Sequence, residues 1–295
     1  MPDLKQKYPP GSVWLYIRIY GGSQALEEWM ISALWDLLSE WKRSGLVKLF
    51  HFIHYLDPQY HLRLRFQLSD PTQAGILLSQ LQCSCRDWLD EDLMWKIEVG
   101  TYEPEYDRYG PERMGLVESW FEIDSLFWFE KIKCHSAEGC SDMWKIAMQS
   151  IDVFLNDFGA VIDDKSNIIN KLRDSAATLF GLNKVMKGQL DVKYRRISSD
   201  IVLLFDKGVA IHDVSLAKRS ADASGIVKKL QESFSDRSAL FESIFLPDLV
   251  HMSLNRAFRT RHRMQELVLF DFLSRYYESA RAIGANSAKA VTSDE

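Results

Sequence analysis

The sequence contains no apolar run that approaches the roughly 20 residues needed for a membrane-spanning helix. Its N-terminus, Met-Pro-Asp-Leu-Lys-Gln-Lys-Tyr-Pro-Pro, lacks the apolar core of a secretory signal. Cysteine is also scarce, with only 4 in 295 residues, which favours reduced thiols over a disulfide framework. Together these absences predict a cytoplasmic protein with no membrane partner.

Motifs for metals and cofactors are missing as well. Cys134 and Cys140, with His135 between them, lack the C-x-x-C spacing of a zinc site, and Cys83 and Cys85 lie two residues apart in a helical pattern. We find no Gly-rich phosphate loop, G-x-S-x-G elbow, H-E-x-x-H motif or dinucleotide fingerprint. The sequence therefore predicts neither a metal nor a cofactor.

An excess of basic residues is absent too. The net charge of -5 argues against direct nucleic-acid binding, which requires phosphates to be neutralised over a wide face. One local basic stretch exists, Arg256, Arg259, Arg261 and Arg263, and a solvated helix surface accounts for it.

Apolar residues make up 46% of the chain and aromatic residues 12%, a composition typical of a globular protein with a sizeable core. Apolar alternation predicts strands over about 12–20, 47–55, 60–68 and 93–103, and helical periodicity predicts helices over about 23–44 and 71–89. The order strand–helix–strand–strand–helix–strand is that of the ferredoxin-like split arrangement. We therefore expect an α+β fold.

Helical periodicity dominates after residue 107. We expect a ferredoxin-like half over 1–106 and a helical half over 107–295 that covers the open face of the sheet in a single body, with a frayed tail after about 283. The expected helices span about 111–133, 141–158, 166–180, 189–206, 221–234, 238–247, 248–259 and 261–283.

Alternation along the strands assigns one set of side chains to the open face of the sheet. This set is too aromatic for open water and too charged for a dry core, and it predicts one wall of a polar pocket. Its members are Trp14, Tyr16, Arg18, Phe50, Phe52, His54, His61, Arg63, Arg65, Lys96 and Glu98.

Three of these residues lie in one segment, His61-Leu-Arg-Leu-Arg65. Alternate residues of a strand share a face and lie about 6.6 Å apart. Two neighbouring guanidinium groups suit a small molecule with two carboxylates, because each can bind one in a bidentate manner. The alternative is that Arg63 and Arg65 pair with acidic residues of covering helices.

The connection Thr-Tyr-Glu-Pro-Glu-Tyr-Asp-Arg-Tyr-Gly, residues 101–110, follows the fourth strand. Arg108 could add a third cation to the pocket. Alternatively, the segment is a connector held by buried tyrosine hydroxyls and a Glu–Arg pair.

His251 and Asn255 lie four residues apart in a predicted helix and therefore share a face. A histidine facing arginines is a candidate proton-transfer group. A histidine buried in the helical core is the alternative.

At these positions the sequence resembles the C-terminal domain of lantibiotic dehydratases, which also occurs alone in thiopeptide biosynthesis. Six segments carry the resemblance, in the same order and over nearly the whole chain. They are Trp14-Leu-Tyr-Ile-Arg-Ile-Tyr20, Phe52-Ile-His-Tyr-Leu-Asp-Pro58, His61-Leu-Arg-Leu-Arg65, Tyr102-Glu-Pro-Glu-Tyr-Asp-Arg-Tyr-Gly110, Glu118-Ser-Trp-Phe-Glu-Ile-Asp-Ser125 and His251-Met-Ser-Leu-Asn-Arg256.

The resemblance implies a lyase. In the family, a large partner domain transfers glutamate from glutamyl-tRNA to a peptide Ser or Thr hydroxyl. The domain resembled here eliminates that glutamate to leave dehydroalanine or dehydrobutyrine. Carried over by motif, the catalytic residues are His251, Arg65 and Arg108. Those expected to bind substrate are His54, His61, Arg63, Tyr102, Asn255 and Arg256.

The chain also departs from the family pattern. His54 stands where the family usually has arginine, and Pro111 follows Gly110 where a second glycine is usual. Because no glutamyl-transfer half is present in the sequence, we expect a stand-alone elimination subunit that acts with a separate glutamyl-tRNA-using transferase on a ribosomally made precursor peptide. Whether the chain forms a homodimer stays open.

Two other functions fit the same residues. Relatives of this domain form the central pyridine of thiopeptides by a formal [4+2] cycloaddition, and in those enzymes the elimination arginines and histidine are lost, whereas this chain keeps them. A non-catalytic escort that only binds the precursor peptide is the other alternative.

Overall fold

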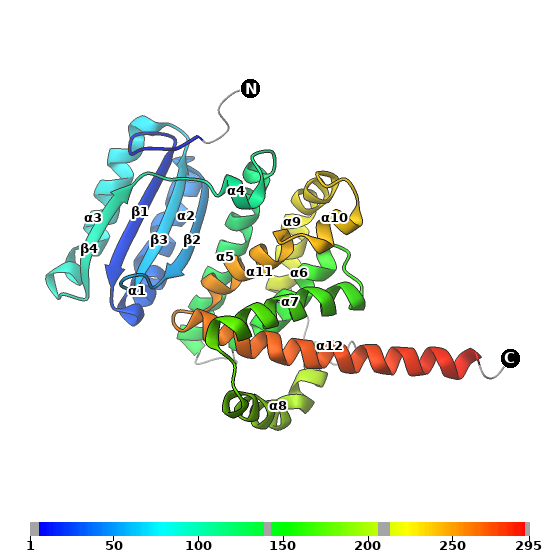
Figure 1. Ribbon diagram of the computed structural model, residues 1–295. Helices are drawn as coiled ribbons and strands as arrows, with labels where there is room; N and C mark the ends of the chain where they lie inside the picture. Colours follow the sequence, from blue (N-terminus) through cyan, green and yellow to red (C-terminus); the bar gives the residue numbers. More distant parts are fainter. Residues whose placement is uncertain (1–5, 139–142, 206–212, 293–295) are drawn as a thin grey trace. The chain divides into compact units, whose positions relative to one another are not determined.

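The computed structural model describes residues 6–138, 143–205 and 213–292. The chain forms two compact units, the first made of residues 1–140 with Asn255–Thr260 and the second of residues 141–254 with 261–295. A small antiparallel sheet belongs to the N-terminal part and the C-terminal part is helical, so the expected α+β class is confirmed (Figure 1). Within the described ranges, no helix is both long and apolar enough to cross a membrane.

The sheet of the first unit has the strand order β2-β3-β1-β4, and each strand is antiparallel to its neighbours. The four strands are β1 (Trp14–Gly21), β2 (Val47–Tyr55), β3 (His61–Leu68) and β4 (Met94–Gly100). The central strands β1 and β3 place apolar side chains such as Ile17 and Leu64 on one face and polar side chains such as Arg65 on the other. We call the second face the polar face.

Helices cover the apolar face of the sheet (Figure 1). They are α1 (Ser23–Trp29), the π-turn η1 (Met30–Leu34), α2 (Trp35–Arg43), the short 3-10 turn η2 (Pro71–Gln73) and α3 (Ala74–Asp90). Two buried indoles join α1 and α2 to α3, because Trp29 Nε1 donates to Ser84 Oγ at 3.2 Å and Trp41 Nε1 donates to Gln80 Oε1 at 2.6 Å.

One more helix of the first unit runs along the edge of the sheet. After the short α4 (Tyr106–Tyr109), helix α5 (Met114–Glu138) lies beside β2 (Figure 1). The backbone N–H groups of Phe50 and Phe52 donate to Glu122 Oε1 at 3.1 Å and to Ser125 Oγ at 3.2 Å. These bonds satisfy the open edge of β2. The expected halves divided at residue 107, whereas the structure groups α5 with the sheet.

The register of β2 corrects one expectation. We expected Phe50, Phe52 and His54 on the same face as Arg65, but they lie opposite Phe66, Leu64 and Leu62, on the apolar face. The residues of β2 on the polar face are His51, Ile53 and Tyr55. Both faces of β2 are buried, so its sequence shows no alternation that would fix the phase, and a shift of one residue exchanges the faces.

The second unit consists of helices, and all eight helices expected after residue 107 are present in the chain with shifted ends. Those beyond α5 are α6 (Met143–Asp157), α7 (Ile162–Phe180), α8 (Lys184–Phe205), α9 (Val214–Glu232), α10 (Arg237–Glu242), α11 (Phe245–Ala257) and α12 (His262–Thr292). The last residues of α11 belong to the first unit. The expected frayed tail is helical as far as Thr292, in keeping with its alanine content, and residues 293–295 and Cys140 lie outside the described residues.

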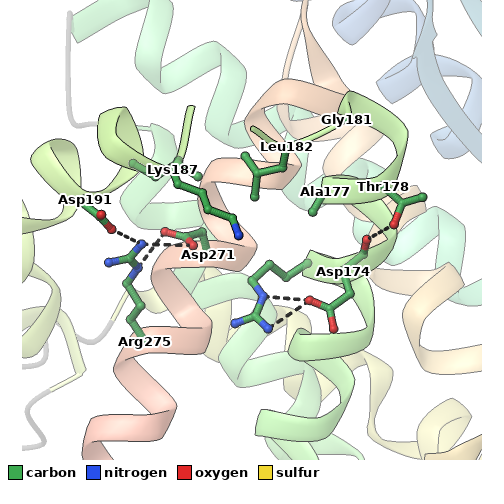
Figure 2. Close-up of a pocket in the computed structure, with 11 residues that line it drawn as sticks. Asp174, Ala177, Thr178, Gly181, Leu182, Lys187, Asp191, Asp271 and Arg275 are labelled. Carbon is green, nitrogen blue, oxygen red and sulfur yellow. Dashed lines mark hydrogen bonds and ion pairs between the residues drawn. The ribbon is translucent and has the colours of Figure 1, made fainter. Parts of the chain in front are cut away.

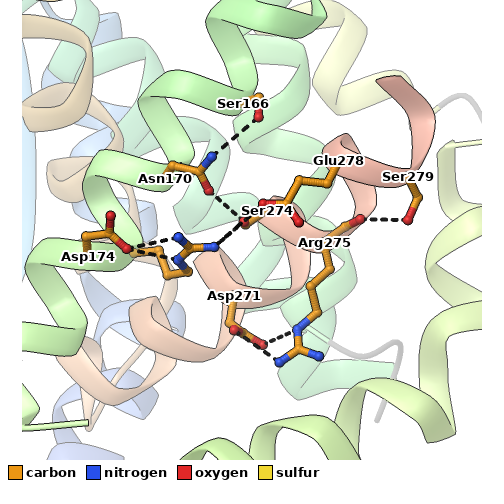
Figure 3. Close-up of polar contacts among 9 residues, drawn as sticks. Ser166, Asn170, Asp174, Asp271, Ser274, Arg275, Glu278 and Ser279 are labelled. Carbon is orange, nitrogen blue, oxygen red and sulfur yellow. Dashed lines mark hydrogen bonds and ion pairs between the residues drawn. The ribbon is translucent and has the colours of Figure 1, made fainter. Parts of the chain in front are cut away.

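A polar seam joins α7 to α12 (Figure 3). Ser274 Oγ donates to Asn170 Oδ1 at 2.6 Å, and Arg173 Nη1 donates to Ser274 Oγ at 2.6 Å. In the same unit, Asp152 Oδ1 accepts from both Lys165 Nζ at 2.6 Å and the Tyr277 hydroxyl at 2.8 Å. Buried polar groups that satisfy one another in this way fix the pairing of the helices.

Candidate functional site

The polar face of the sheet carries a row of three side chains at the same level. Arg65 of β3 lies opposite Tyr16 of β1 and opposite His51 of β2. The Arg65 guanidinium is 5.1 Å from the centre of the Tyr16 ring and 5.6 Å from that of Tyr102, which follows β4. Aromatic faces of this kind stabilise a cation by their ring electrons.

Arg65 is 8% exposed, yet its Nε and Nη1 atoms are buried without a hydrogen-bond partner among the described residues. A buried guanidinium normally pairs with a carboxylate or several acceptors, since leaving donors unsatisfied costs about 1–3 kcal/mol each. Unpaired donors on a buried cation are therefore typical of a site that receives an anion.

His51 is also buried, and neither of its ring nitrogens has a hydrogen-bond partner among the described residues. Burial, followed by the positive charges of Arg65 and Arg256, lowers the pKa of His51 well below its usual value. The imidazole is therefore neutral at physiological pH. Three rings surround it at 5.4–6.2 Å, those of Trp14, Tyr102 and Phe121.

Glu118, in the second turn of α5, supplies a carboxyl group to this region. The Tyr102 hydroxyl donates to Glu118 Oε1 at 2.8 Å, and both residues are buried. Burial raises the pKa of the Glu118 carboxyl to about 7, although the Tyr102 hydrogen bond and the Arg65 charge oppose the rise. We call His51, Arg65, Tyr102 and Glu118 the buried cluster.

Arg256 lies beside the cluster with no exposed surface. Its Nη1 donates to Asp124 Oδ2 at 3.2 Å, its Nε donates to Ser125 Oγ at 2.9 Å, and its guanidinium lies 4.7 Å from the Phe121 ring. Burial lowers the pKa of Arg256, whereas the nearby Asp124 carboxylate acts in the opposite direction. The sequence predicted substrate binding for Arg256, and the structure gives it a buried ion pair that ties residues 255–260 to α5.

Arg63 and His61 form a second, connected pair on the polar face. The Gln59 carbonyl accepts from His61 Nδ1 at 2.8 Å, so Nε2 carries the lone pair that accepts from Arg63 Nε at 3.1 Å. The Arg63 guanidinium stacks on the Tyr55 ring at 3.4 Å. Arg63 is half-buried and shares the face of Arg65, as predicted.

Three other predicted residues of the first unit are not members of the buried cluster. Arg108 is exposed and forms an ion pair with Glu105 at 2.6 Å; this pair helps to line a surface pocket of about 480 Å³ formed by residues 6–7 and 103–108. His54 lies on the apolar face, where its Nδ1 is 2.6 Å from the Tyr60 hydroxyl. Asn255 directly precedes Arg256 and is half-buried.

His251 belongs to the second unit. Its Nδ1 lies within hydrogen-bond distance of the buried Glu266 carboxylate and 3.2 Å from Arg263 Nη1, which donates to the other Glu266 oxygen at 3.3 Å. A carboxylate that accepts from Nδ1 orients the ring and places the lone pair on Nε2, the tautomer required of a general base. The meeting of His251 with the arginines of the first unit stays a prediction.

The sequence alone did not single out His51 or Glu118. His51 was missed because β2 has apolar residues in both phases, so the face of the strand was misassigned. Glu118 belongs to a segment that carried the family resemblance, and a signal for it existed. It is a charged residue next to Val117 and Phe121 on a helix whose apolar positions predict burial.

A larger pocket lies in the second unit, between α7, α8 and α12, with a volume of about 610 Å³ (Figure 2). Its charged lining is largely self-paired. Arg275 bonds to Asp271 and Asp191 at 2.8 and 2.7 Å, and Arg173 bonds to Asp174 at 3.1 Å (Figure 2). Because these charges balance one another, the buried cluster of the first unit is the better candidate for an anion site.

Comparison with known proteins identifies the family. Residues 14–277 match the family described as lantibiotic biosynthesis dehydratase C-term, and the chain belongs to this family. It is 24% identical over 273 residues to the subtilin biosynthesis protein SpaB of Bacillus subtilis. The aligned region covers 88% of this chain and 25% of SpaB. The chain thus spans about a quarter of the length of that relative.

Solved structures share this fold, and two of them are compared with the chain. The tRNA-dependent lantibiotic dehydratase MibB from Microbispora sp. 107891 matches 90% of this chain and 28% of its own, with a TM-score of 0.68 and 19% identity. The pyridine synthase TbtD from thiomuracin biosynthesis matches 91% of this chain and 98% of its own, with a TM-score of 0.64 and 11% identity. At these identities the likeness establishes the fold alone.

Proposed function

We propose that this chain eliminates glutamate from O-glutamylated Ser or Thr residues of a ribosomally made precursor peptide, which leaves dehydroalanine or dehydrobutyrine. Membership of the dehydratase family supports the reaction class. The observation that carries the proposal is Arg65, a buried cation with unpartnered donors, on the same strand face as Arg63.

The chemistry requires an anion site and a base. A base removes the α-proton of the modified residue, the electron pair forms the Cα=Cβ double bond, and the Cβ–O bond breaks to release glutamate. The leaving group gains a carboxylate in this step and already carries another. Guanidinium groups carried on alternate positions of one strand, whose backbones lie about 6.6 Å apart, can bind both carboxylates and stabilise the charge as it develops.

His251 is the proposed base for the α-proton. Its pairing with the Glu266 carboxylate holds Nδ1 protonated and leaves the lone pair on Nε2. The proposal requires the second unit to present His251 to the polar face of the first, so that the helical part covers the sheet. We interpret the strand order β2-β3-β1-β4 as the ferredoxin-like split arrangement, whose second face needs such a cover.

Arg108 has a less direct proposed role. It pairs with Glu105 at the surface, so we assign it to binding the peptide or the outer carboxylate of the glutamyl group. The elimination also presupposes a glutamyl-tRNA-using transferase that loads the peptide, and this partner and the precursor peptide are the proposed partners.

A second candidate function is pyridine formation from two dehydroalanines. The likeness to TbtD, which this chain covers almost end to end, favours it. A cycloaddition between two neutral alkenes has no use for a buried arginine with unpartnered donors, whereas glutamate release does. Elimination therefore remains the first proposal.

The test supplies purified protein with a synthetic precursor peptide that carries O-glutamylserine, with and without its leader, and follows the peptide mass. Loss of glutamic acid supports elimination. Loss of the leader from a peptide with two dehydroalanines supports pyridine formation instead, and saturable binding with no change of mass supports an escort.

Site variants make the same assay specific. We expect Arg65→Ala and His251→Ala to fold normally and to let glutamylated peptide accumulate. Arg43→Ala is the matched control, because Arg43 is exposed on α2 with only a loose pair to Glu40 at 3.9 Å. Wild-type elimination rates in both site variants would disprove the assignment of the site.

A further inference from the structure

Glu118 has no role in the elimination as described so far, although it faces the anion site. It is 7% exposed, it accepts the Tyr102 hydroxyl at 2.8 Å, and the Tyr102 ring lies under the Arg65 guanidinium at 5.6 Å. The hydrogen-bonded pair therefore places a titratable carboxyl next to the buried cation whose Nε and Nη1 are unpartnered.

Titratable and charged groups from several segments lie around Glu118. β3 contributes Arg65, β2 contributes the neutral His51, and the segment after β4 contributes Tyr102. The N-terminal segment contributes Tyr8, whose pKa the Glu118 charge helps to raise. Near the same cluster, Arg256 is balanced by Asp124 of α5.

Apart from the Arg256–Asp124 pair, this arrangement contains one cation, Arg65, and one titratable carboxyl, Glu118. With Arg256 matched to Asp124, ionised Glu118 is the carboxylate available to balance Arg65 in the empty site. A substrate carboxylate that binds Arg65 brings a second negative charge into the same buried volume. Two carboxylates at one buried cation repel each other, and a proton on one of them relieves the repulsion.

We propose that Glu118 balances Arg65 while the site is empty and takes up one proton from solvent when a substrate carboxylate replaces it. The proton returns to solvent when the carboxylate leaves. Glu118 thus acts as a positioning residue whose negative charge offsets that of Arg65 between substrates, across the Tyr102 ring that lies between them. The identity of the substrate anion rests on the proposed function, whereas the pairing of Glu118 with Arg65 does not.

The pKa of the Glu118 carboxyl makes this proton exchange measurable near neutral pH. Burial raises the pKa of Glu118 to about 7, and the positive charge of Arg65 keeps this pKa from rising further. Loss of that charge is expected to raise the Glu118 pKa by about one unit or more. Binding of an anion at Arg65 has the same effect, because it cancels the same charge.

The first experiment follows Glu118 by ¹³C NMR in protein labelled at the glutamate side-chain carboxyl carbon, with the resonance assigned by its absence in Glu118→Gln. We expect the titration midpoint to rise by about one pH unit in Arg65→Met. Arg63→Met is the matched control, since Arg63 is on the same strand and face but pairs with His61, and there the midpoint stays where it was. An equal midpoint in wild type and Arg65→Met would overturn the pairing.

A second arm needs no arginine variant and so survives any failure of Arg65→Met to fold. Free glutamate is added to the unmodified protein, and the Glu118 midpoint should rise as the ligand saturates. Bound glutamate that leaves the midpoint unchanged overturns the proton exchange. Glutamate that does not bind at all, while Arg65→Met still shifts the midpoint, counts against glutamate elimination and leaves the pairing supported.

A kinetic readout separates positioning from a purely structural role. Ionised Glu118 competes with substrate, so the KM of the wild type for glutamylated peptide should rise above pH 7, at most about tenfold per pH unit for one coupled proton. Glu118→Gln should keep its low-pH KM across this range, so that the pH dependence of KM is lost whatever the value of kcat. If Glu118→Gln retains the wild-type pH dependence of KM, the exchange does not take place.

Discussion

Arg65 and His51 lie directly opposite each other in neighbouring strands, and in the described part of the chain no hydrogen bond reaches Arg65 Nε or Nη1 or either nitrogen of His51. A cation and a neutral imidazole with open polar atoms are costly inside a protein. Their persistence side by side is the observation on which we propose that the polar face receives a ligand.

Replacing Arg65 by lysine tests the need for a guanidinium group. Lysine keeps the charge but cannot form two parallel bonds to a carboxylate, so we expect elimination to slow by about 100-fold. The measurement is the rate of glutamate release under single-turnover conditions. Arg65→Lys activity within about threefold of wild type would show that charge alone suffices.

Glu118→Gln should change the pH dependence of stability. Burial raises the pKa of Glu118 from 4.5 to about 7, so the fold prefers the protonated form. Stability from this group is complete below pH 4.5 and is lost as pH rises to about 7, up to about 3 kcal/mol. Urea unfolding at several pH values should show that the loss disappears in Glu118→Gln. The control is Glu130→Gln, which is exposed on the same helix and should retain the wild-type profile.

His51→Phe should have the opposite effect on pH dependence. Burial, with help from Arg65 and Arg256, lowers the pKa of His51 well below 6.5, so the fold prefers the neutral ring. Stability from this group is present above pH 6.5 and is lost as pH falls below it. His51→Phe should therefore unfold less readily than wild type at pH 5, by urea titration. The exposed His135→Gln should not, and equal acid sensitivity in His51→Phe and wild type would contradict the assignment.

Asp124→Asn should destabilise the first unit strongly. The substitution leaves Arg256 buried without its counter-charge, which costs about 3–5 kcal/mol. Denaturant unfolding measures the loss. Asp222→Asn is the control, because the exposed Lys218–Asp222 pair contributes under about 1 kcal/mol. Similar stabilities of the two variants would mean that Arg256 is held by other groups.

Much of this architecture could be predicted from the pattern of apolar residues. The alternation in β1 and β3 is clear, so Arg63 and Arg65 were placed on one face correctly. The helical periodicity after residue 107 likewise predicted the helices of that part of the chain. β2 could not be phased, because it is buried on both sides, and this error hid His51 and misplaced His54. The pairing of Arg256 with Asp124 joins residues 132 positions apart and leaves no local signal.

The most direct test of the central claim is the fate of a peptide that carries a single O-glutamylserine. Incubated with the purified protein and followed by mass spectrometry, it should lose one glutamic acid and gain a thiol-reactive dehydroalanine. Addition of excess free glutamate should slow the reaction, because the product competes for Arg65. A peptide that binds saturably and keeps its glutamyl group throughout would contradict elimination by this chain.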